Sequence, residues 1–147
     1  MILFLDFDGT CHPFDCQAAG ARHFCYLPRI EMVLREFGFV KIVIASEWRR
    51  HHSLDELTSQ FAADLRPRVI GVTPELPGTA LEPLKGVRRR EAIAYLAEND
   101  LDRARWAALD DLSVLWEPVE PNIIICNDGF LEREEQALRC FLLDASG

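Results

Sequence analysis

Residues 1–10, MILFLDFDGT, carry an apolar run directly into two aspartates and a Gly-Thr turn. Residues 2–5 (ILFL) lack the polar alternation of a half-exposed strand, so they predict a short strand buried on both faces, as in a parallel sheet. Asp6 and Asp8 follow, separated only by Phe7. Two carboxylates at this spacing repel when both are ionised, so stability alone does not favour the pair. The pair therefore indicates either a turn at a strand end or the start of an active site.

The rest of the chain alternates predicted strands and helices. Further strands are expected at 39–46, 68–72, 105–111 and 122–126, and helices at 27–38, 53–65, 89–100 and 131–143. Strands without polar alternation that alternate with helices predict a three-layer α/β fold with a mainly parallel sheet. In such sheets, ligands bind beyond the carboxyl ends of the strands.

The composition is that of an ordinary folded domain. The chain of 147 residues is 49% hydrophobic and 27% charged, which predicts one domain over residues 1–147. No apolar run reaches the roughly eighteen residues of a membrane span, and the N-terminus lacks the basic start of a secretory signal. Five cysteines without a C-x-x-C pair indicate reduced thiols and a cytoplasmic protein.

The net charge of −8 argues against broad electrostatic attraction to nucleic acid. The positive charge is nevertheless clustered, in WRRHH (48–52), RPR (66–68) and GVRRR (86–90). These clusters are either solvated surfaces or, in the first and third case, groups that flank a site.

Side chains that can do chemistry follow the predicted strands at one edge of the sheet. The first strand leads into Asp6 and Asp8, the second into Ser46, and the fourth into Asp110-Asp111. Several carboxylates at one edge are unfavourable unless a cation neutralises them, and a divalent cation with oxygen ligands does so. With Mg²⁺ present, the first carboxylate can attack a phosphorus atom, and the second carboxyl can protonate the leaving oxygen and later activate water. The pattern favours an active site over a turn.

This order of parts resembles the haloacid dehalogenase (HAD) superfamily of phosphotransferases, whose first motif is D-x-D-x-T. DFDGT at residues 6–10 matches that motif in full. The resemblance implies a Rossmann-like HAD fold with Asp6 as the nucleophile that forms an aspartyl-phosphate. It also implies that Asp8 is the general acid and base and that Ser46 donates a hydrogen bond to the phosphoryl group. The acid at position 8 and Thr10 are features of the phosphatase branch.

The resemblance also implies the metal ligands and a phosphate-binding base. Mg²⁺ would be held by Asp6, Asp8, Asp110 and Asp111. The third motif places a Lys or Arg at the start of the helix before the last acidic strand, where Lys85, Arg88, Arg89 and Arg90 compete. We expect Arg89 in this role, because it lies four residues before the first core position of that helix. An Arg there can bind phosphate through two parallel hydrogen bonds.

Many relatives insert a cap domain after the first or the second motif. Here the intervals 11–45 and 47–88 already hold predicted helices and strands, so neither has room for a separate cap, and only a small flap over 11–26 remains. An uncapped site is open to solvent and suits a terminal phosphate on a large molecule. The residues expected to bind this substrate are Thr10, Arg49, Arg88 and Arg90.

The chain is more loosely similar to small capless HAD domains associated with RNA repair. These share DFDG followed by His-Pro (CHP, 11–13), an S-x-W-R pattern (SEWR, 46–49) and a late LDD (109–111). The similarity implies a Mg²⁺-dependent phosphomonoesterase acting on the terminal phosphate of a nucleic acid or nucleotide. A phosphatase of sugar or other small-molecule phosphates and a slow, phosphate-responsive binding or regulatory module remain as alternatives. The physiological substrate, the oligomeric state and any ligase or kinase partner stay open.

Overall fold

The fold is built on a parallel sheet, seen in a computed structural model that describes residues 1–76 and 84–147. Over these residues the sheet has five strands in the order β3-β2-β1-β4-β5, and every neighbouring pair is parallel. The strands are β1 (Ile2–Leu5), β2 (Lys41–Ile44), β3 (Val69–Val72), β4 (Trp106–Asp110) and β5 (Ile123–Ile125). The predicted α/β fold with a mainly parallel sheet is confirmed.

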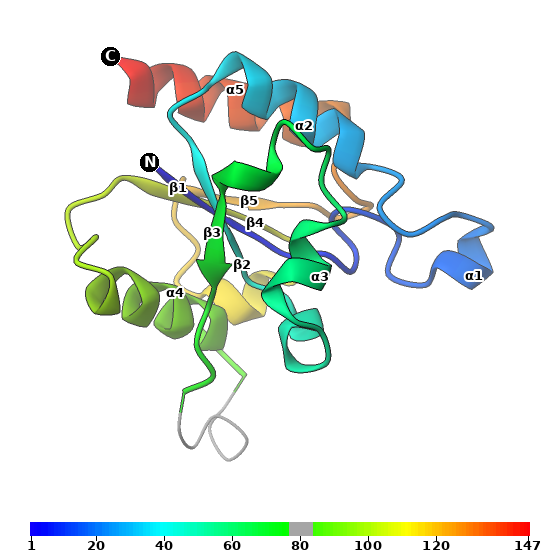
Figure 1. The fold of residues 1–147 in the computed structure, drawn as a ribbon, viewed down its shortest axis with the longest axis horizontal. Coiled ribbons are helices and arrows are strands. Elements are labelled where there is room, and N and C mark those ends of the chain that lie inside the picture. Colours follow the sequence, from blue (N-terminus) through cyan, green and yellow to red (C-terminus); the bar gives the residue numbers. More distant parts are fainter. Residues whose placement is uncertain (77–83) are drawn as a thin grey trace.

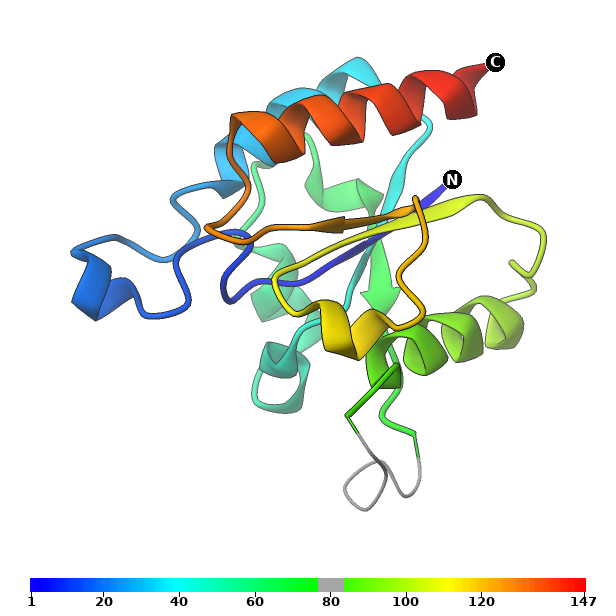
Figure 2. The same ribbon diagram turned by 180° about the vertical axis from the view of Figure 1, so that it is seen from behind.

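Helices cover both faces of the sheet. They are α1 (Cys16–Ala19), α2 (Leu27–Glu36), α3 (Leu54–Thr58), α4 (Val87–Glu98) and α5 (Glu132–Ser146), with 3₁₀ turns η1 (Glu47–Arg50), η2 (Arg66–Arg68) and η3 (Ser113–Trp116). Helices α2 and α5 lie side by side on one face, and α4 lies on the other (Figures 1 and 2). The result is the three-layer arrangement that buried parallel strands require.

The predicted elements are present, although their ends differ. The helix expected over 53–65 starts with the capping box of Ser53 and Glu56 but ends at Thr58. The helix expected from residue 89 starts two residues earlier, directly after Gly86, whose φ of 73° is a conformation that glycine adopts without strain. Residues 73–86, whose prolines and glycines predict a loop, lie partly outside the described residues.

The core lies on both sides of the central strand β1. The side chain of Leu3 belongs to the cluster under α2 and α5. Phe4 points the other way, and its ring packs against Tyr95, Trp106 and Trp116 with centroids 5.6–6.3 Å apart. Each fully buried side chain of this kind contributes on the order of 1.5–3 kcal/mol relative to an exposed one. The strand that leads into the two aspartates is therefore firmly anchored.

The strand order places the carboxyl ends of β1 and β4 beside each other at the middle of the sheet. Leu5 is paired with Leu109, and the N–H of Asp6 donates to the Leu109 carbonyl at 3.0 Å. Asp6 and Asp110 are thus the next residues on adjacent strands. The connections leave β1 and β4 in opposite directions across the sheet, and ligands bind at such a switch point.

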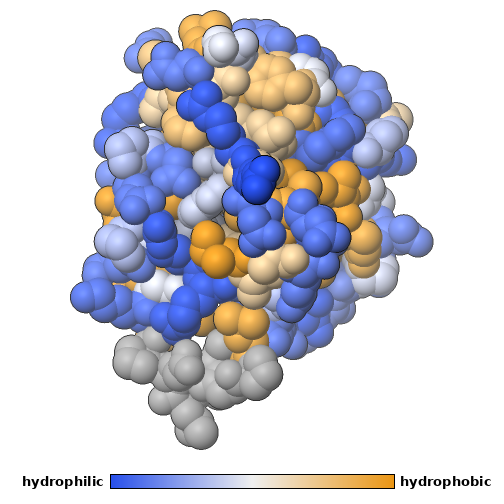
Figure 3. Space-filling model, turned by 90° about the vertical axis from the view of Figure 1, so that its left-hand side faces the viewer, coloured by the Kyte–Doolittle hydropathy of each residue, from blue (hydrophilic) through white to orange (hydrophobic). Residues whose placement is uncertain are grey.

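The helices and the face of the surface shown in Figure 3 do not point to a particular function. None of the described helices is both long and apolar enough to span a membrane. On the face seen in Figure 3, apolar side chains reach the surface in several places between hydrophilic ones, which is common on folded proteins.

Phe4→Ala should lower the free energy of unfolding by about 3–5 kcal/mol, because it empties a site enclosed by three rings. Urea denaturation measures the loss. Phe39→Ala is the control, since Phe39 is 42% exposed, and it should cost less than about 1 kcal/mol. Losses of similar size in the two variants would contradict the placement of Phe4 in the core.

Candidate active site

The first motif forms a tight turn directly after β1. Gly9 has a φ of 78°, and the N–H groups of Thr10 and Cys11 both donate to the Phe7 carbonyl. A Cβ on residue 9 would overlap the carboxylate of Asp111. The glycine of DFDGT is therefore needed twice, for its backbone conformation and for the room it leaves to an acidic side chain.

A small pocket opens at this turn, with a volume of about 90 Å³. Four aspartates, one glutamate, one arginine and three apolar side chains line it: Asp6, Asp8, Asp110, Asp111, Glu47, Arg88, Phe14, Leu112 and Leu115. These residues come from the ends of β1 and β4, from η1, from α4, from the segment after the first motif and from the turn after β4 that includes η3.

Three carboxylates of the pocket form a tight cluster. Oxygens of Asp6, Asp110 and Asp111 lie within 4.8 Å of one another. Burial, together with the charges of Asp110 and Asp111, raises the pKa of Asp6 well above its usual value. Burial likewise raises the pKa of Asp110 to about 7. Both shifts show that this arrangement disfavours full ionisation without a cation, and the oxygen-only donor set suits a hard divalent metal.

Hydrogen bonds hold Asp110 in one orientation. Its Oδ1 accepts from the N–H of Leu112 at 3.0 Å, and its Oδ2 accepts from Nε1 of Trp116 at 2.8 Å. Trp116 is fully buried under α4. The orientation of the Asp110 carboxylate is therefore fixed by Trp116, a residue of the core on the α4 face of the sheet.

Asp8 lies in the same pocket but in a different environment. It accepts from Nε2 of His12 at 2.7 Å and from Nε1 of Trp48 at 3.0 Å. The His12 ring is oriented by the N–H of Phe24, which donates to Nδ1 at 3.0 Å and leaves Nε2 as the donor. The His12 hydrogen bond, with a smaller contribution from Trp48, lowers the pKa of Asp8. Environment thus pushes the pKa values of Asp6 and Asp8 in opposite directions.

Arg88 is the cation of the pocket. Its side chain is 5% exposed and forms ion pairs with Glu91 and Glu47, at 2.8 and 2.7 Å. Its Nε is buried and has no hydrogen-bond partner among the described residues. A buried donor without a partner is unfavourable, and an anion in the pocket is a suitable acceptor for it.

Comparison with protein families finds one family model that matches most of the chain. A model described as the HAD domain in Swiss Army Knife RNA repair proteins matches residues 2–134. The chain belongs to this family. The resemblance read from DFDGT, and the looser similarity to domains of RNA repair, are confirmed. Family membership suggests a phosphatase-type hydrolase in the context of RNA repair. The searches of curated proteins and of solved structures returned no match.

In this HAD domain, Arg89 does not line the carboxylate pocket, against expectation. Arg89 instead pairs with Glu120 at 3.0 Å and lies over the ring of Trp106. The reason is the start of α4 at Val87, which puts Arg88 on the side of the pocket. One residue later the helix has rotated by about 100°, so Arg89 points elsewhere.

The other basic candidates of the third motif also lie outside the pocket. Lys85 is exposed and pairs with Glu117 at 3.2 Å. Arg90 donates to the carbonyl of Lys85 at 2.9 Å. Neither side chain lines the pocket, so the structure does not support the expected role of Arg90 in substrate binding.

Arg49 is also turned into the protein, against expectation. Its side chain is only 3% exposed. Its guanidinium donates to the carbonyls of Thr73 and Ser46, each at 3.0 Å, and to the Glu91 carboxylate at 2.9 Å. Arg49 therefore joins η1 to α4 and to the chain after β3, and it leaves no open edge for a substrate phosphate.

Ser46 and Thr10 lie next to the site rather than in its wall. Ser46 is fully buried, and its Oγ accepts from the N–H of Trp48 at 3.3 Å as the cap of η1. Thr10 is also fully buried, and its carbonyl accepts from the N–H of Phe130 at 2.9 Å. In this conformation both residues shape the turns that carry Glu47 and Asp8.

The sequence alone did not single out the partners of these groups. His12 and Trp48 are the donors to Asp8, and Glu91 and Glu47 are the ion-pair partners of Arg88. A signal existed for the first two, because CHP and SEWR are the patterns shared with the RNA-repair domains. No local pattern marks the two glutamates.

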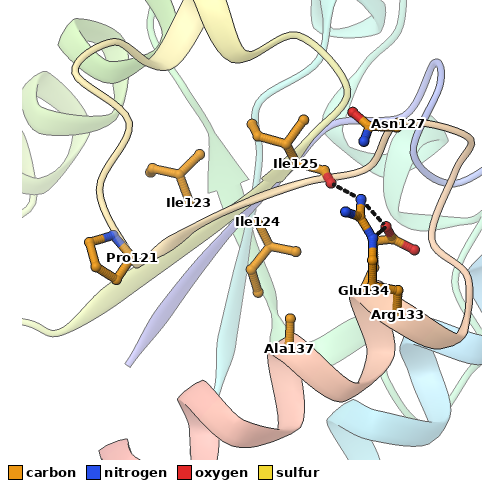
Figure 4. Close-up of a pocket in the computed structure, with 8 residues that line it drawn as sticks. All are labelled: Pro121, Ile123, Ile124, Ile125, Asn127, Arg133, Glu134 and Ala137. Atoms are coloured by element: carbon orange, nitrogen blue, oxygen red, sulfur yellow. Dashed lines mark hydrogen bonds and ion pairs between the residues drawn. The ribbon is translucent and has the colours of Figure 1, made fainter.

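A larger cavity lies away from these groups. It has a volume of about 360 Å³ and lies between β5 and the start of α5 (Figure 4). Ile123, Ile124, Ile125 and Ala137 line much of it, and its charged groups, Arg133 and Glu134, are paired with each other. It offers no chemistry comparable with the carboxylate pocket.

The carboxylate cluster should make the protein less stable as the pH rises in metal-free buffer. The unfolded chain loses these protons near pH 4, whereas folded Asp110 keeps its proton up to about pH 7. The folded state therefore binds more protons in this window, and the free energy of unfolding falls between pH 5 and pH 8.

Asp111→Asn should make the free energy of unfolding fall less between pH 5 and pH 8, because it removes one charge that repels Asp6 and Asp110. Urea denaturation at pH 5 and pH 8 with a chelator measures both slopes. Asp128→Asn is the matched control on an exposed aspartate outside the pocket. Equal slopes in all three proteins would contradict the repulsion in the cluster.

Proposed function

We propose that this HAD domain is a Mg²⁺-dependent phosphomonoesterase that acts through an aspartyl-phosphate on Asp6. Its substrate is the terminal phosphate of a nucleic acid or nucleotide. The observation that carries the proposal is the single pocket that joins Asp6, Asp8 and the Asp110-Asp111 pair with the buried Arg88. These groups match the needs of phosphoryl transfer, in which a nucleophile is positioned and negative charge is stabilised.

The carboxylate cluster is the place for the metal. Of the four aspartates expected to hold Mg²⁺, Asp6, Asp110 and Asp111 would do so, since their oxygens lie close enough together to share one ion, whereas Asp8 lies outside that cluster. Bound there, Mg²⁺ would supply positive charge that offsets the repulsion between these groups and stabilises the transferring phosphoryl group. With that repulsion offset, Asp6 would be ionised, which is the form that attacks.

The reaction then follows from the two aspartates. A carboxylate oxygen of Asp6 attacks the phosphorus, the bond to the leaving oxygen breaks, and the carboxyl group of Asp8 gives that oxygen a proton. In the second step water attacks the phosphorus of the aspartyl-phosphate, and Asp8 takes its proton. Inorganic phosphate leaves and Asp6 is free again. The hydrogen bonds from His12 and Trp48 keep Asp8 in place through both steps.

The unpartnered Nε of Arg88 supports a role in binding the phosphoryl group. Its two Nη atoms are already bonded to Glu91 and Glu47, which fixes the plane of the guanidinium. Arg88 is therefore the proposed base of the third motif in place of Arg89.

The size of the pocket supports a terminal phosphate on a larger molecule. A volume of about 90 Å³ is well below the roughly 300–1,000 Å³ of sites that enclose a whole small ligand. Only the end group of a substrate fits inside, and the rest must lie against the rim. A family defined by RNA repair proteins makes an RNA end the first candidate.

Asp6→Asn should lower kcat for a 3′- or 5′-phosphorylated oligonucleotide on the order of 10⁴-fold or more, because the amide cannot form the covalent intermediate. Phosphate release with and without Mg²⁺ measures the effect, and unchanged circular dichroism controls for folding. Wild-type hydrolysis that needs no divalent metal, or near wild-type rates in Asp6→Asn, would contradict the mechanism. Faster hydrolysis of sugar phosphates would favour a small-molecule phosphatase.

Arg88→Lys should lower kcat/KM about 10²-fold or more, since one fixed donor to the developing charge is lost. Arg89→Lys is the matched neighbour on the same helix and should change kcat/KM little, because Arg89 faces Glu120. Steady-state kinetics on one phosphorylated oligonucleotide compares the two. A larger loss in the Arg89 variant would reverse the assignment of the third motif.

A further inference from the structure

The rim of the carboxylate pocket carries apolar side chains that the catalytic steps do not use. Phe14 is 76% exposed although it lines the pocket. Leu112, which is 48% exposed, and the partly buried Leu115 line it from the turn after β4. Apolar surface therefore borders the aspartates from two separate segments of the chain.

The segment that presents Phe14 is held in place. Pro13 precedes it and restricts the backbone. Asp15 follows it and caps α1, accepting the N–H of Ala18 at 2.9 Å. Just before Pro13, His12 is fixed between Asp8 and the N–H of Phe24. An exposed aromatic ring on a fixed support loses little freedom when a ligand packs on it, which is the condition for efficient binding.

The charges around the pocket do not provide a track for further phosphates. Arg49 and Arg88 are both paired with the buried Glu91, and Arg88 also with Glu47. The pocket itself holds four aspartates. Among the described residues that line the pocket, Arg88 is the only cation and it is already paired, so we expect the substrate to be held there largely by something other than its backbone charge.

A nucleobase fits this combination of features. It offers a planar apolar face at a short distance from the terminal phosphate, whereas a sugar phosphate offers a smaller, non-planar C–H surface surrounded by hydroxyl groups. Bases stack on single aromatic side chains without sequence preference. The leucine side chains that reach the rim from the turn after β4 can pack against the sugar or the base.

On the basis of the proposed function, we propose that Phe14 is the stacking surface for the base of the terminal phosphorylated nucleotide. Leu112 and Leu115 form the other apolar part of the rim. The substrate is then defined as a nucleotide end, recognised by its phosphate in the pocket and by its base on the rim. The loss of one base–aromatic stack corresponds to roughly a 5- to 150-fold change in affinity.

The test compares two RNA oligonucleotides with the same terminal phosphate, one with adenine on the last nucleotide and one abasic there. The ratio of their KM values is measured for the wild type, Phe14→Ala, Phe14→Trp and Phe39→Ala. The same ratio of Kd values is measured by fluorescence anisotropy in an Asp6→Asn background, where turnover is blocked. Phe39 is the matched control, an exposed phenylalanine in the turn before β2, at the other end of that strand from the site.

The wild type and Phe39→Ala should favour the adenine substrate by roughly 5- to 150-fold. Phe14→Ala should bring the ratio close to one, and Phe14→Trp should keep it. A wild-type ratio near one, or a ratio that Phe14→Ala leaves intact, would overturn the stacking role even if hydrolysis is observed. If no substrate is hydrolysed but the Kd ratio still depends on Phe14, the proposed function fails and the base-binding surface stands.

Discussion

The candidate site is organised around carboxylates that the fold forces together at the centre of the sheet, where they repel one another. Parallel pairing of β1 with β4 puts Asp6 and Asp110 on adjacent strand ends, and Gly9 leaves room for Asp111 beside them. Burial raises the pKa of Asp6 and that of Asp110. Such an arrangement persists because β1 and all of β4 except Trp106 are buried, and the proposed Mg²⁺ would supply the balancing positive charge.

Around this cluster, residues of the same type have different roles because their environments differ. Donors from His12 and Trp48 position Asp8 and lower its pKa, while Asp6 lies in the repulsive, buried group. Among the arginines, Arg88 reaches the pocket and Arg49 serves as a buried clamp. The same two residue types thus carry different roles because of what each side chain contacts.

Features that lie within a few consecutive residues could be predicted from the sequence. The buried β1 strand, the DFDGT turn and the acid pair after β4 are of this kind, because a strand and the turn after it are local. The position of Arg88 in the pocket could not be predicted from the sequence, because it depends on whether α4 begins at residue 87 or 89. Arg49 was misjudged because its partners Thr73 and Glu91 are distant in sequence. No hydrophobic periodicity in the sequence marks Phe14. Its position on the rim of the pocket is what suggests a role in binding.

The most direct test of the account is chemical capture of the covalent intermediate. Wild-type protein is mixed with Mg²⁺ and a phosphorylated oligonucleotide, quenched in acid and reduced with borohydride, which converts an aspartyl-phosphate to homoserine. Peptide mass spectrometry then locates the changed residue. The account predicts homoserine at position 6, only when Mg²⁺ and substrate are both present. Substrate turnover with position 6 still aspartate, or homoserine at position 8, 110 or 111, would contradict it.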